Sequence, residues 1–443
     1  MSKLIKEASI RHFEQARQYI PGGIQSNYRK DANYLPTYMS HGRDARLFDI
    51  DGNEYIDYSL SYGPSILGHS NEALRRAVVT QAEKMYSNEL NVLELEAAKK
   101  IVQHVPCAEL VRFACSGTEA NFNALRVARA HTGRNMVVRF NGHYNGSLDS
   151  LIGGVVNDPG HPVPSDGERE DDLFSQMGNT QGRAAHAFDD SYMIEWNDLP
   201  ALATLLAKHG AGIAAVYMEP VMVNMHGCMP EPGYLEGVRQ LCDRYGVVLI
   251  FDEVITGFRI GLGGAQACFG VTPDLCTFAK ALGGGFPVSA FCGKREIMDA
   301  ITRTDVIAAG TYNGHPLAMA AVVATIEELE RDNGAVYARM YRLGNQLAAG
   351  LRELFARHEP RFILQGFPTC WTLGWSESGR IRNQSDALGD GLLNVLAFSK
   401  LLNQQGILAQ TRFCLSAAHV AADIKETLRR AEAALKEFVA GRS

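Results

Sequence analysis

The segment PDLCTFAKALGGGFP, residues 273–287, places a single lysine in an apolar run and three glycines shortly after it. Lys280 carries an ammonium group, which is costly to bury unless the charge has a partner or a chemical role. Gly283, Gly284 and Gly285 allow the backbone to bend and to approach a ligand closely. The alternative is a surface lysine whose stem lies along apolar surface while its charge stays in water.

Short strand-like runs surround this segment and alternate with helix-like stretches from about residue 70 onward. The runs are LVRFAC, MVVRF, IAAVYMEPV, VVLIFDEV and VSAFCG. Most are apolar throughout, which is typical of parallel strands covered by helices on both faces. The sequence therefore predicts an α/β fold. Because ligands of such sheets bind beyond the carboxyl ends of the strands, the residue that follows each run is a candidate site residue.

Regions outside these runs have their own signatures. RLFDIDGNEYIDYS alternates around Asp51-Gly52 and predicts a hairpin. Residues 155–195 hold three prolines and an acidic string, so we expect a long surface loop or lid, with a solvated insertion of no role as the alternative. Residues 391–405 and 421–440 predict two amphipathic helices.

Composition excludes several classes of protein. The 443 residues carry a net charge of −6 and contain no long basic run, which argues against nucleic-acid binding. No apolar stretch reaches the roughly 18–20 residues that span a bilayer, and the N-terminal residues lack a signal-peptide core. We therefore expect a cytoplasmic protein. The nine cysteines include no Cys-x-x-Cys pair, so we expect buried reduced thiols rather than disulfides or a zinc site, and no metal ligands.

Two strand ends offer groups for a charged ligand. Asp252 closes the run VVLIF, where an isolated carboxylate needs a partner; the alternative is a helix cap or a structural salt bridge. Ser116, Gly117 and Thr118 stand where a strand turns into a helix, and free N–H groups at a helix start can bind an anion. The alternative for these three residues is ordinary N-cap chemistry.

Further candidates complete the set. Tyr144 ends another strand between glycines, although a single tyrosine usually serves packing. GTYNGHP, residues 310–316, is a second glycine-rich turn before a helix. A lysine, a buried acid, an aromatic plate and anion sites together match pyridoxal phosphate. Lys280 would form a Schiff base with the aldehyde, its pKa lowered by desolvation, and Asp252 would keep the ring nitrogen protonated.

Six motifs in this order resemble the class III, fold-type I pyridoxal-phosphate aminotransferases, and most closely the glutamate-1-semialdehyde 2,1-aminomutase branch. They are CSGTEA, GHYNG, MEPV, FDEVITGFR, DLCTFAKALGGGFP and GTYNGHPLAM. The resemblance implies a mostly parallel seven-stranded sheet flanked by helices in a large cofactor-binding domain over 66–312. It implies a smaller α/β C-terminal domain over 313–443. An N-terminal helix and hairpin over 1–65 would contribute to the small domain and to the active site.

The resemblance also implies roles around the cofactor ring. Lys280 would carry a proton as well as form the Schiff base, and Asp252 would pair with the ring nitrogen. Val254 and Tyr144 would pack on opposite ring faces. Glu219 would lie near the ring hydroxyl or the incoming amine. One motif departs from the family pattern, because Asn145 follows Tyr144 where a histidine is usual, and this leaves the polar contacts beside the ring open.

At the phosphate, Ser116, Gly117 and Thr118 would bind the cofactor of the same subunit. Thr311 would reach the phosphate of the neighbouring subunit's cofactor. The resemblance therefore implies a homodimer with active sites at the subunit interface.

Two arginines bear on the substrate. Arg29, in IPGGIQSNYRK, matches the position of a carboxylate clamp in the branch, for which a guanidinium is well suited; the alternative is an exposed arginine in a polar loop. Thr411-Arg412 stands where the aminomutase has a glutamate. An arginine there suits a second carboxylate better than a diamine.

We therefore predict a ping-pong aminotransferase that acts on small amino-acid and keto-acid substrates, with no nucleic acid and no membrane as partner. The first alternative is intramolecular amine transfer, as in the aminomutase, or a racemase or decarboxylase on the same fold. A regulator that binds the cofactor without catalysis is a second alternative, and a structural protein is a distant third.

Overall fold

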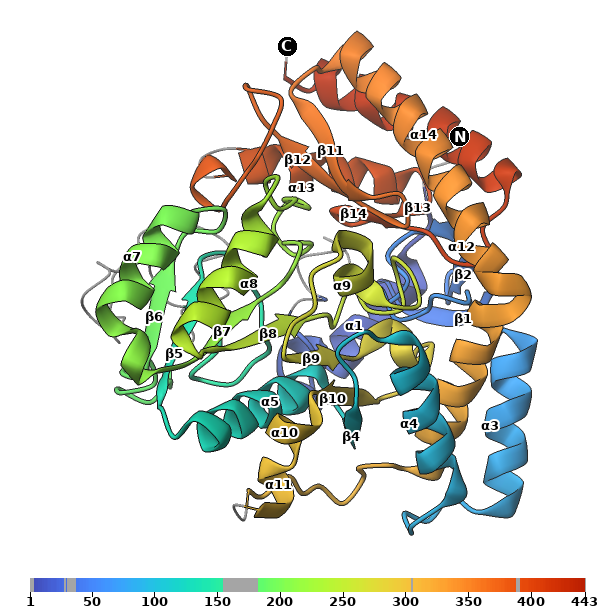
Figure 1. The fold of residues 1–443 in the computed structure, drawn as a ribbon. Helices are drawn as coiled ribbons and strands as arrows, with labels where there is room; N and C mark the ends of the chain where they lie inside the picture. The colour runs from blue at the N-terminus through green and yellow to red at the C-terminus, as the bar shows by residue number, and fades with distance from the viewer. Residues whose placement is uncertain are drawn as a thin grey trace.

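The computed structural model describes residues 4–27, 29, 37–153, 182–303, 306–387 and 391–442. Its centre is a seven-stranded sheet with the strand order β4-β10-β9-β8-β7-β5-β6 (Figure 1). β10 runs antiparallel to β4 and β9, and the other neighbours are parallel, which confirms the predicted mostly parallel sheet. The strands are β4 Leu110–Ala114, β5 Met136–Phe140, β6 Ser191–Ile194, β7 Ile213–Met218, β8 Val248–Asp252, β9 Leu275–Phe278 and β10 Ser289–Gly293.

Helices cover both faces of this sheet because its strands are apolar on both faces. Ile250 packs with the residues of α5, whereas its neighbours Leu249 and Phe251 belong to the core on the opposite face. Burying each such side chain stabilises the fold by about 1.5–3 kcal/mol. The helices between residues 72 and 303 are α3 Glu72–Lys84, α4 Val92–His104, α5 Gly117–Thr132, α7 Leu199–His209, η2 Gly210–Gly212, α8 Tyr234–Tyr245, α9 Gly264–Phe269, η3 Lys280–Gly283, α10 Arg295–Met298 and α11 Ala300–Arg303.

The prediction of a loop over residues 155–195 is wrong for the last part of that range. Ser191–Ile194 forms the edge strand β6, parallel to β5, and all four residues are buried. A four-residue strand next to a polar stretch leaves too short an apolar run for its pattern to be recognised. Residues 154–181 of the expected loop lie outside the described residues.

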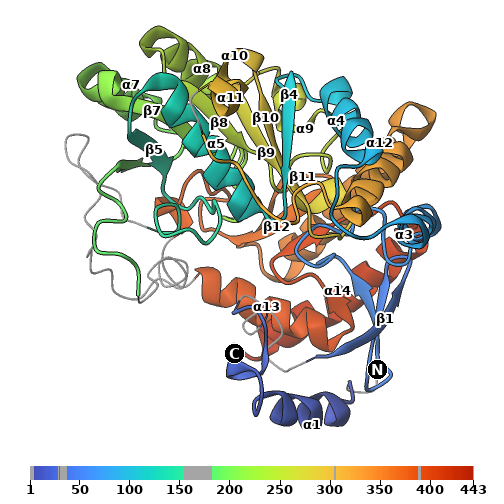
Figure 2. The ribbon, with the colours of Figure 1, turned by 90° about the horizontal axis from the view of Figure 1, so that it is seen from below.

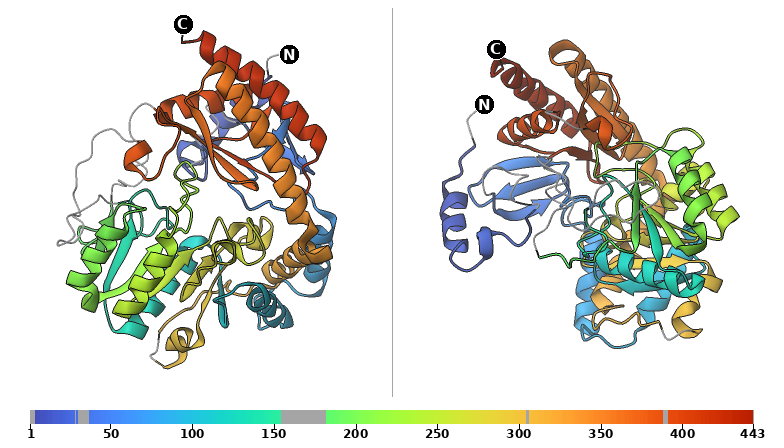
Figure 3. Two further views of the ribbon diagram at one scale, coloured as in Figure 1. Left: turned by 45° about the horizontal axis from the view of Figure 1, so that its top comes forward. Right: turned by 90° about the vertical axis from the view of Figure 1, so that its left-hand side faces the viewer.

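The N-terminal segment adds a helix and a hairpin. α1 Glu7–Ala16 precedes the turn η1 Pro21–Gly23, and β1 Met39–Arg43, β2 Arg46–Asp49 and β3 Glu54–Asp57 pair antiparallel (Figure 2). The hairpin predicted around Asp51-Gly52 is thus present between β2 and β3. β13 Ile407–Leu408 adds to β3 in parallel, so the two ends of the chain share one sheet (Figure 3).

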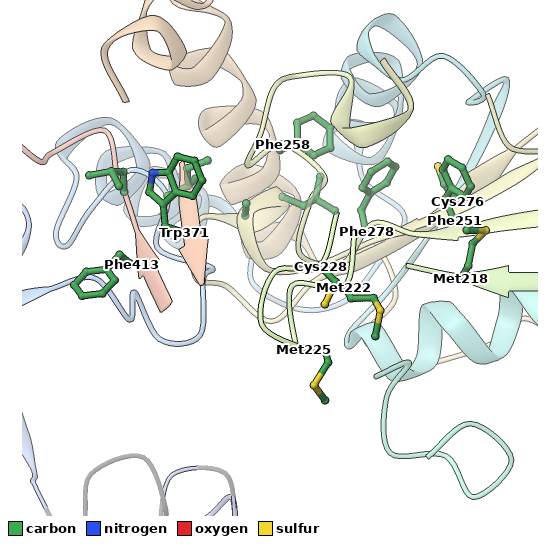
Figure 4. Close-up of a cluster of buried hydrophobic side chains, with 14 of the residues drawn as sticks. Met218, Met222, Met225, Cys228, Phe251, Phe258, Cys276, Phe278, Trp371 and Phe413 are labelled. Carbon is green, nitrogen blue, oxygen red and sulfur yellow. The ribbon is translucent and has the colours of Figure 1, made fainter. Parts of the chain in front are cut away.

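A long helix connects the central sheet to the C-terminal part. α12 Pro316–His358 contacts η3 with its first half and α14 with its second, and its backbone leaves helical geometry at 331–334. Met218 and Phe251 of the central sheet belong to the same buried cluster as Trp371 and Phe413 (Figure 4). The remaining elements are β11 Phe362–Phe367, β12 Cys370–Trp375, η4 Ser385–Ala387, α13 Gly391–Gln404, β14 Arg412–Cys414 and α14 Ala421–Ala440. Within the described ranges, no helix combines the length and apolarity that crossing a membrane requires.

Candidate active site

Asp252, the last residue of β8, is buried and held by three hydrogen bonds. Its carboxylate accepts from Asn121 Nδ2 and Asn145 Nδ2, each at 2.8 Å, and from the Val254 N–H at 3.0 Å. Burial raises the pKa of Asp252, while the hydrogen bonds from Asn145 and Val254 and the charge of Lys280 oppose that rise. An ionised carboxylate only accepts hydrogen bonds, so this fixed acid suits an N–H donor. Asn145, which stands where a histidine is usual in the family, therefore has a polar role at the site, because its amide orients Asp252.

Lys280 lies at the same edge of the sheet. Asp252 and Thr277 are register partners in β8 and β9, and Lys280 follows three residues later in a left-handed conformation with φ 45°. Burial, and then the positive charge of Arg412, lowers the pKa of Lys280 to about 8, against the opposing effect of the carboxylates of Asp252 and Glu219. A substantial fraction of this amine is therefore neutral near pH 8, as a nucleophile requires.

A strained turn borders this lysine. Residues 60–63 are consecutive left-handed residues, with φ between 48° and 108°. Such conformations cost about 1–3 kcal/mol each in residues other than glycine, so the surrounding structure must hold them. Arg259, which is 1% exposed, donates to the backbone carbonyls of Gly63, Thr369 and, at 3.0 Å, Leu415. Its guanidinium thus joins three segments around the site.

The start of α5 forms the opposite end of the site. Ser116 is the N-cap, and its Oγ accepts from the Glu119 N–H at 3.3 Å, so its hydroxyl proton is still available to donate. Gly146, with φ +99°, lies so close that a Cβ there would be 2.6 Å from Thr118 Oγ1. A Cβ on Gly117 would be 3.2 Å from Val254, the second residue after Asp252. The helix N-terminus, the acid and the lysine segment therefore converge.

A chain of polar contacts leads from the backbone of Tyr144 to Arg412. Glu219 accepts from the Tyr144 N–H at 2.7 Å and from Asn224 Nδ2 at 3.3 Å. Arg412 Nη2 donates to Asn224 Oδ1 at 3.2 Å. Burial, and then the charge of Asp252, raises the pKa of Glu219 to about 8. His143 Nδ1 accepts from the Glu219 N–H at 2.9 Å, and burial lowers the pKa of His143 to about 3, so its ring is neutral.

The structure places two of the predicted residues apart from this centre. Thr311 is exposed, and its carbonyl accepts a hydrogen bond from Asn88 on the surface beside the start of α5. It lines a surface pocket of about 250 Å³ together with Glu119 and Arg126. Arg29 is exposed, its N–H donates to the Ser26 carbonyl, and most of the segment that follows it lies outside the described residues.

Three residues of the site were missed by sequence reasoning. Asn121 follows Gly117 by one helical turn, a spacing that could have placed it below the phosphate turn. Asn145 stood out only as a departure from a motif. Arg259 belongs to the motif FDEVITGFR, but no local pattern identifies backbone carbonyls as its partners.

This donor set fits pyridoxal phosphate. Asp252 offers a buried acceptor for a protonated ring nitrogen, and Gly117 and Gly146 leave room beside Thr118 at a helix start. A helix N-terminus suits a phosphate because its free N–H groups and dipole both favour an anion. Lys280 supplies the amine within the same site.

Comparisons with known proteins agree with this geometry. Residues 27–364 match the family described as Aminotransferase class-III. A glutamate-1-semialdehyde 2,1-aminomutase of Syntrophomonas wolfei is 38% identical, covering 97% of this chain and 98% of its own. An omega-transaminase from Sphaerobacter thermophilus superposes with a TM-score of 0.86 at 29% identity, covering 97% of this chain and 98% of that one. A glutamate-1-semialdehyde aminomutase from Pseudomonas aeruginosa gives 0.85 at 25% identity, covering 97% and 94%. The chain therefore belongs to the class III aminotransferases, enzymes that use pyridoxal phosphate.

Proposed function

We propose that this enzyme transfers an amino group between separate molecules, from an amino-acid donor to a keto or aldehyde acceptor that bears a carboxylate. The observation that supports this choice is the position of Arg412, whose charge acts on Lys280 and whose guanidinium is held by Asn224. A fixed cation there attracts a carboxylate and repels a substrate with two amines.

Bound pyridoxal phosphate supplies an electron sink for the substrate carbon next to the amine. Ser116, Gly117 and Thr118 would hold the phosphate, and Asp252 would hold the proton on the ring nitrogen. The Lys280 amine would take a proton from the substrate carbon and deliver it to the C4′ carbon of the cofactor. In this proposal Val254 and Tyr144 contact the two faces of the ring.

Substrate recognition would rest on carboxylate binding. Arg412, oriented by Asn224, would bind one carboxylate, and Arg29 would bind the carboxylate of the acceptor. Glu219 stays largely protonated below pH 8, as its pKa of about 8 implies, so it does not repel a substrate carboxylate. It can then accept or donate a hydrogen bond near the incoming amine.

We also propose a homodimer in the cytoplasm. Large apolar side chains are exposed beside Thr311, and they would be covered by a second copy of the chain. They belong to two segments that the hydrogen bond between Asn88 and Thr311 joins, and they are Tyr86, Leu90, Val92, Leu95, Ile307 and Tyr312. All nine cysteines are free thiols, which fits a reducing compartment.

Intramolecular transfer is the second candidate function, favoured by the 38% identical aminomutase. One experiment separates the two. Holoenzyme is mixed with a single amino acid and no acceptor, and product is counted per active site. An aminotransferase stops after one equivalent and its cofactor absorbance changes once, whereas a mutase continues to turn over. Sustained turnover of one substrate would overturn the proposal, and an unchanged spectrum with every amino acid would favour a regulator.

A further inference from the structure

Three cysteines meet in the core, on the face of the sheet opposite α5. Cys276 in β9 and Cys292 in β10 face each other as register partners, and Cys107 comes from the loop after α4. The Cys276 sulfur lies 3.1 Å from that of Cys107 and 3.3 Å from that of Cys292. All three sulfurs lie within 4.8 Å of one another, and all three residues are buried free thiols.

The cluster is separate from the active site. Cys276 packs in the same core as Phe251 and Phe278 (Figure 4), whereas its neighbour Leu275 packs in the core formed by α5. Asp252 makes its contact with α5 through Asn121, so the acid and the thiols lie on opposite faces of the sheet. The proposed aminotransferase reaction uses none of the three thiols.

The spacing of the sulfurs restricts what they can bind. Tetrahedral zinc, with Zn–S bonds of about 2.3 Å, holds its sulfur ligands about 3.8 Å apart. In the structure, the Cys276 sulfur lies closer than that to the sulfurs of both Cys107 and Cys292. A three-coordinate pyramidal centre with a lone pair has bond angles below the tetrahedral value and brings its sulfurs closer together. Trivalent arsenic is such a centre.

The net charge of the bound site also favours trivalent arsenic. Three thiolates around a divalent cation would leave one net negative charge, and around a monovalent cation two. The carboxylates of Glu253 and Asp274 already act on these thiols, so an additional buried negative charge would be costly. Three thiolates on arsenic(III) give a neutral group, which an apolar core can accept.

We propose that Cys107, Cys276 and Cys292 form a binding site for trivalent arsenic taken up as arsenous acid. Three As–O bonds break and three As–S bonds form, and each thiol proton leaves with a hydroxide as water. Arsenic stays trivalent and no oxidant is needed. Arsenous acid is neutral at pH 7 and small, so it enters an apolar interior through local opening without carrying charge.

The test uses holoenzyme that has been reduced with a phosphine and then incubated with sodium arsenite. After desalting, native mass spectrometry should show one arsenic gained and three protons lost per chain. X-ray absorption at the arsenic edge should show three sulfur neighbours. The visible absorbance of the bound cofactor shows that the protein stayed native during loading.

Variants assign the site. Cys276→Ser should weaken arsenite binding at least tenfold, and Cys107→Ser serves if that core variant does not fold. Cys242→Ser, a buried thiol outside the cluster, should bind as the wild type does. Cys370→Ser removes a competing pair, since the sulfurs of Cys370 and Cys414 lie 2.8 Å apart, and it should retain three-sulfur coordination.

Four outcomes would overturn the proposal. The first is that native wild-type holoenzyme retains no arsenic. The second is coordination by two sulfurs, and the third is unchanged binding in Cys276→Ser and Cys107→Ser. The fourth is loss of binding in Cys370→Ser. None of these outcomes depends on whether the enzyme is a transaminase or a mutase.

Discussion

At the scale of single residues, Lys280 is the group on which the proposed chemistry depends. We expect Lys280→Ala to lower turnover at least about a thousandfold, because a positioned acid–base group contributes about 10²–10⁴ and, in the proposed mechanism, this lysine would also anchor the cofactor. Steady-state assays of the amino transfer, with cofactor added, measure the loss. Lys294→Ala is the matched control, since Lys294 pairs with Asp274 away from the site. Normal rates in the Lys280 variant would refute the assignment.

The pKa of the same lysine predicts how the apoenzyme captures its cofactor. Only the neutral amine attacks an aldehyde, and a pKa of about 8 means that its neutral fraction rises as pH passes through 8. The rate of pyridoxal phosphate capture should therefore rise with a midpoint near pH 8. An unperturbed lysine would show no midpoint below pH 10. Stopped-flow absorbance on apoenzyme measures the profile.

Arg412 is predicted to set part of that midpoint, because its positive charge lowers the pKa of Lys280. Arg412→Gln removes the charge, so the midpoint should move upward. A shift of one unit lowers the neutral fraction at pH 7 about tenfold. Arg382→Gln, which breaks only an exposed pair with Asp386, should leave the profile unchanged. If the midpoint stays the same in Arg412→Gln, the Arg412 charge does not lower the pKa of Lys280.

At the scale of elements, the turn at Gly146 borders the proposed phosphate site beside Thr118. Gly146→Ala would put a Cβ 2.6 Å from Thr118 Oγ1 at a φ of +99°, so the start of α5 must shift. We expect the dissociation constant of pyridoxal phosphate to rise about tenfold or more, equivalent to roughly 1.4 kcal/mol. Gly212→Ala, where no atom lies within 4 Å of the added carbon, is the control. Equal affinity in both variants would remove Gly146 from the phosphate site.

The elements also show what the sequence could and could not predict. The apolar run before Asp252 is a signal contained in neighbouring residues. Both the strand and the acid at the end of that strand could therefore be predicted from the sequence. The amides that orient Asp252 come from α5 and from the loop after β5, so their meeting depends on how the sheet is assembled. The pairing of β3 with β13 and the carbonyl contacts of Arg259 also join segments far apart in the chain. Such contacts leave no periodic pattern in the sequence.

At the scale of the whole molecule, the exposed apolar surface beside Thr311 predicts association. Leu90 is 94% exposed, and a second copy that covers it would remove a large apolar side chain from water. Leu90→Asp should therefore shift the protein from dimer to monomer at micromolar concentration in analytical ultracentrifugation. Activity should fall as the dimer dissociates, because in the proposed dimer Thr311 would reach the cofactor phosphate of the other subunit.

The control for this prediction is a second exposed leucine. Leu393 on α13 is 61% exposed and belongs to neither of the two segments that form the surface around Thr311, so we expect Leu393→Asp to leave both the mass and the activity unchanged. If Leu90→Asp remains dimeric, this surface is not the interface. If it becomes monomeric but keeps full activity, Thr311 has no role across the interface and each active site is complete within one chain.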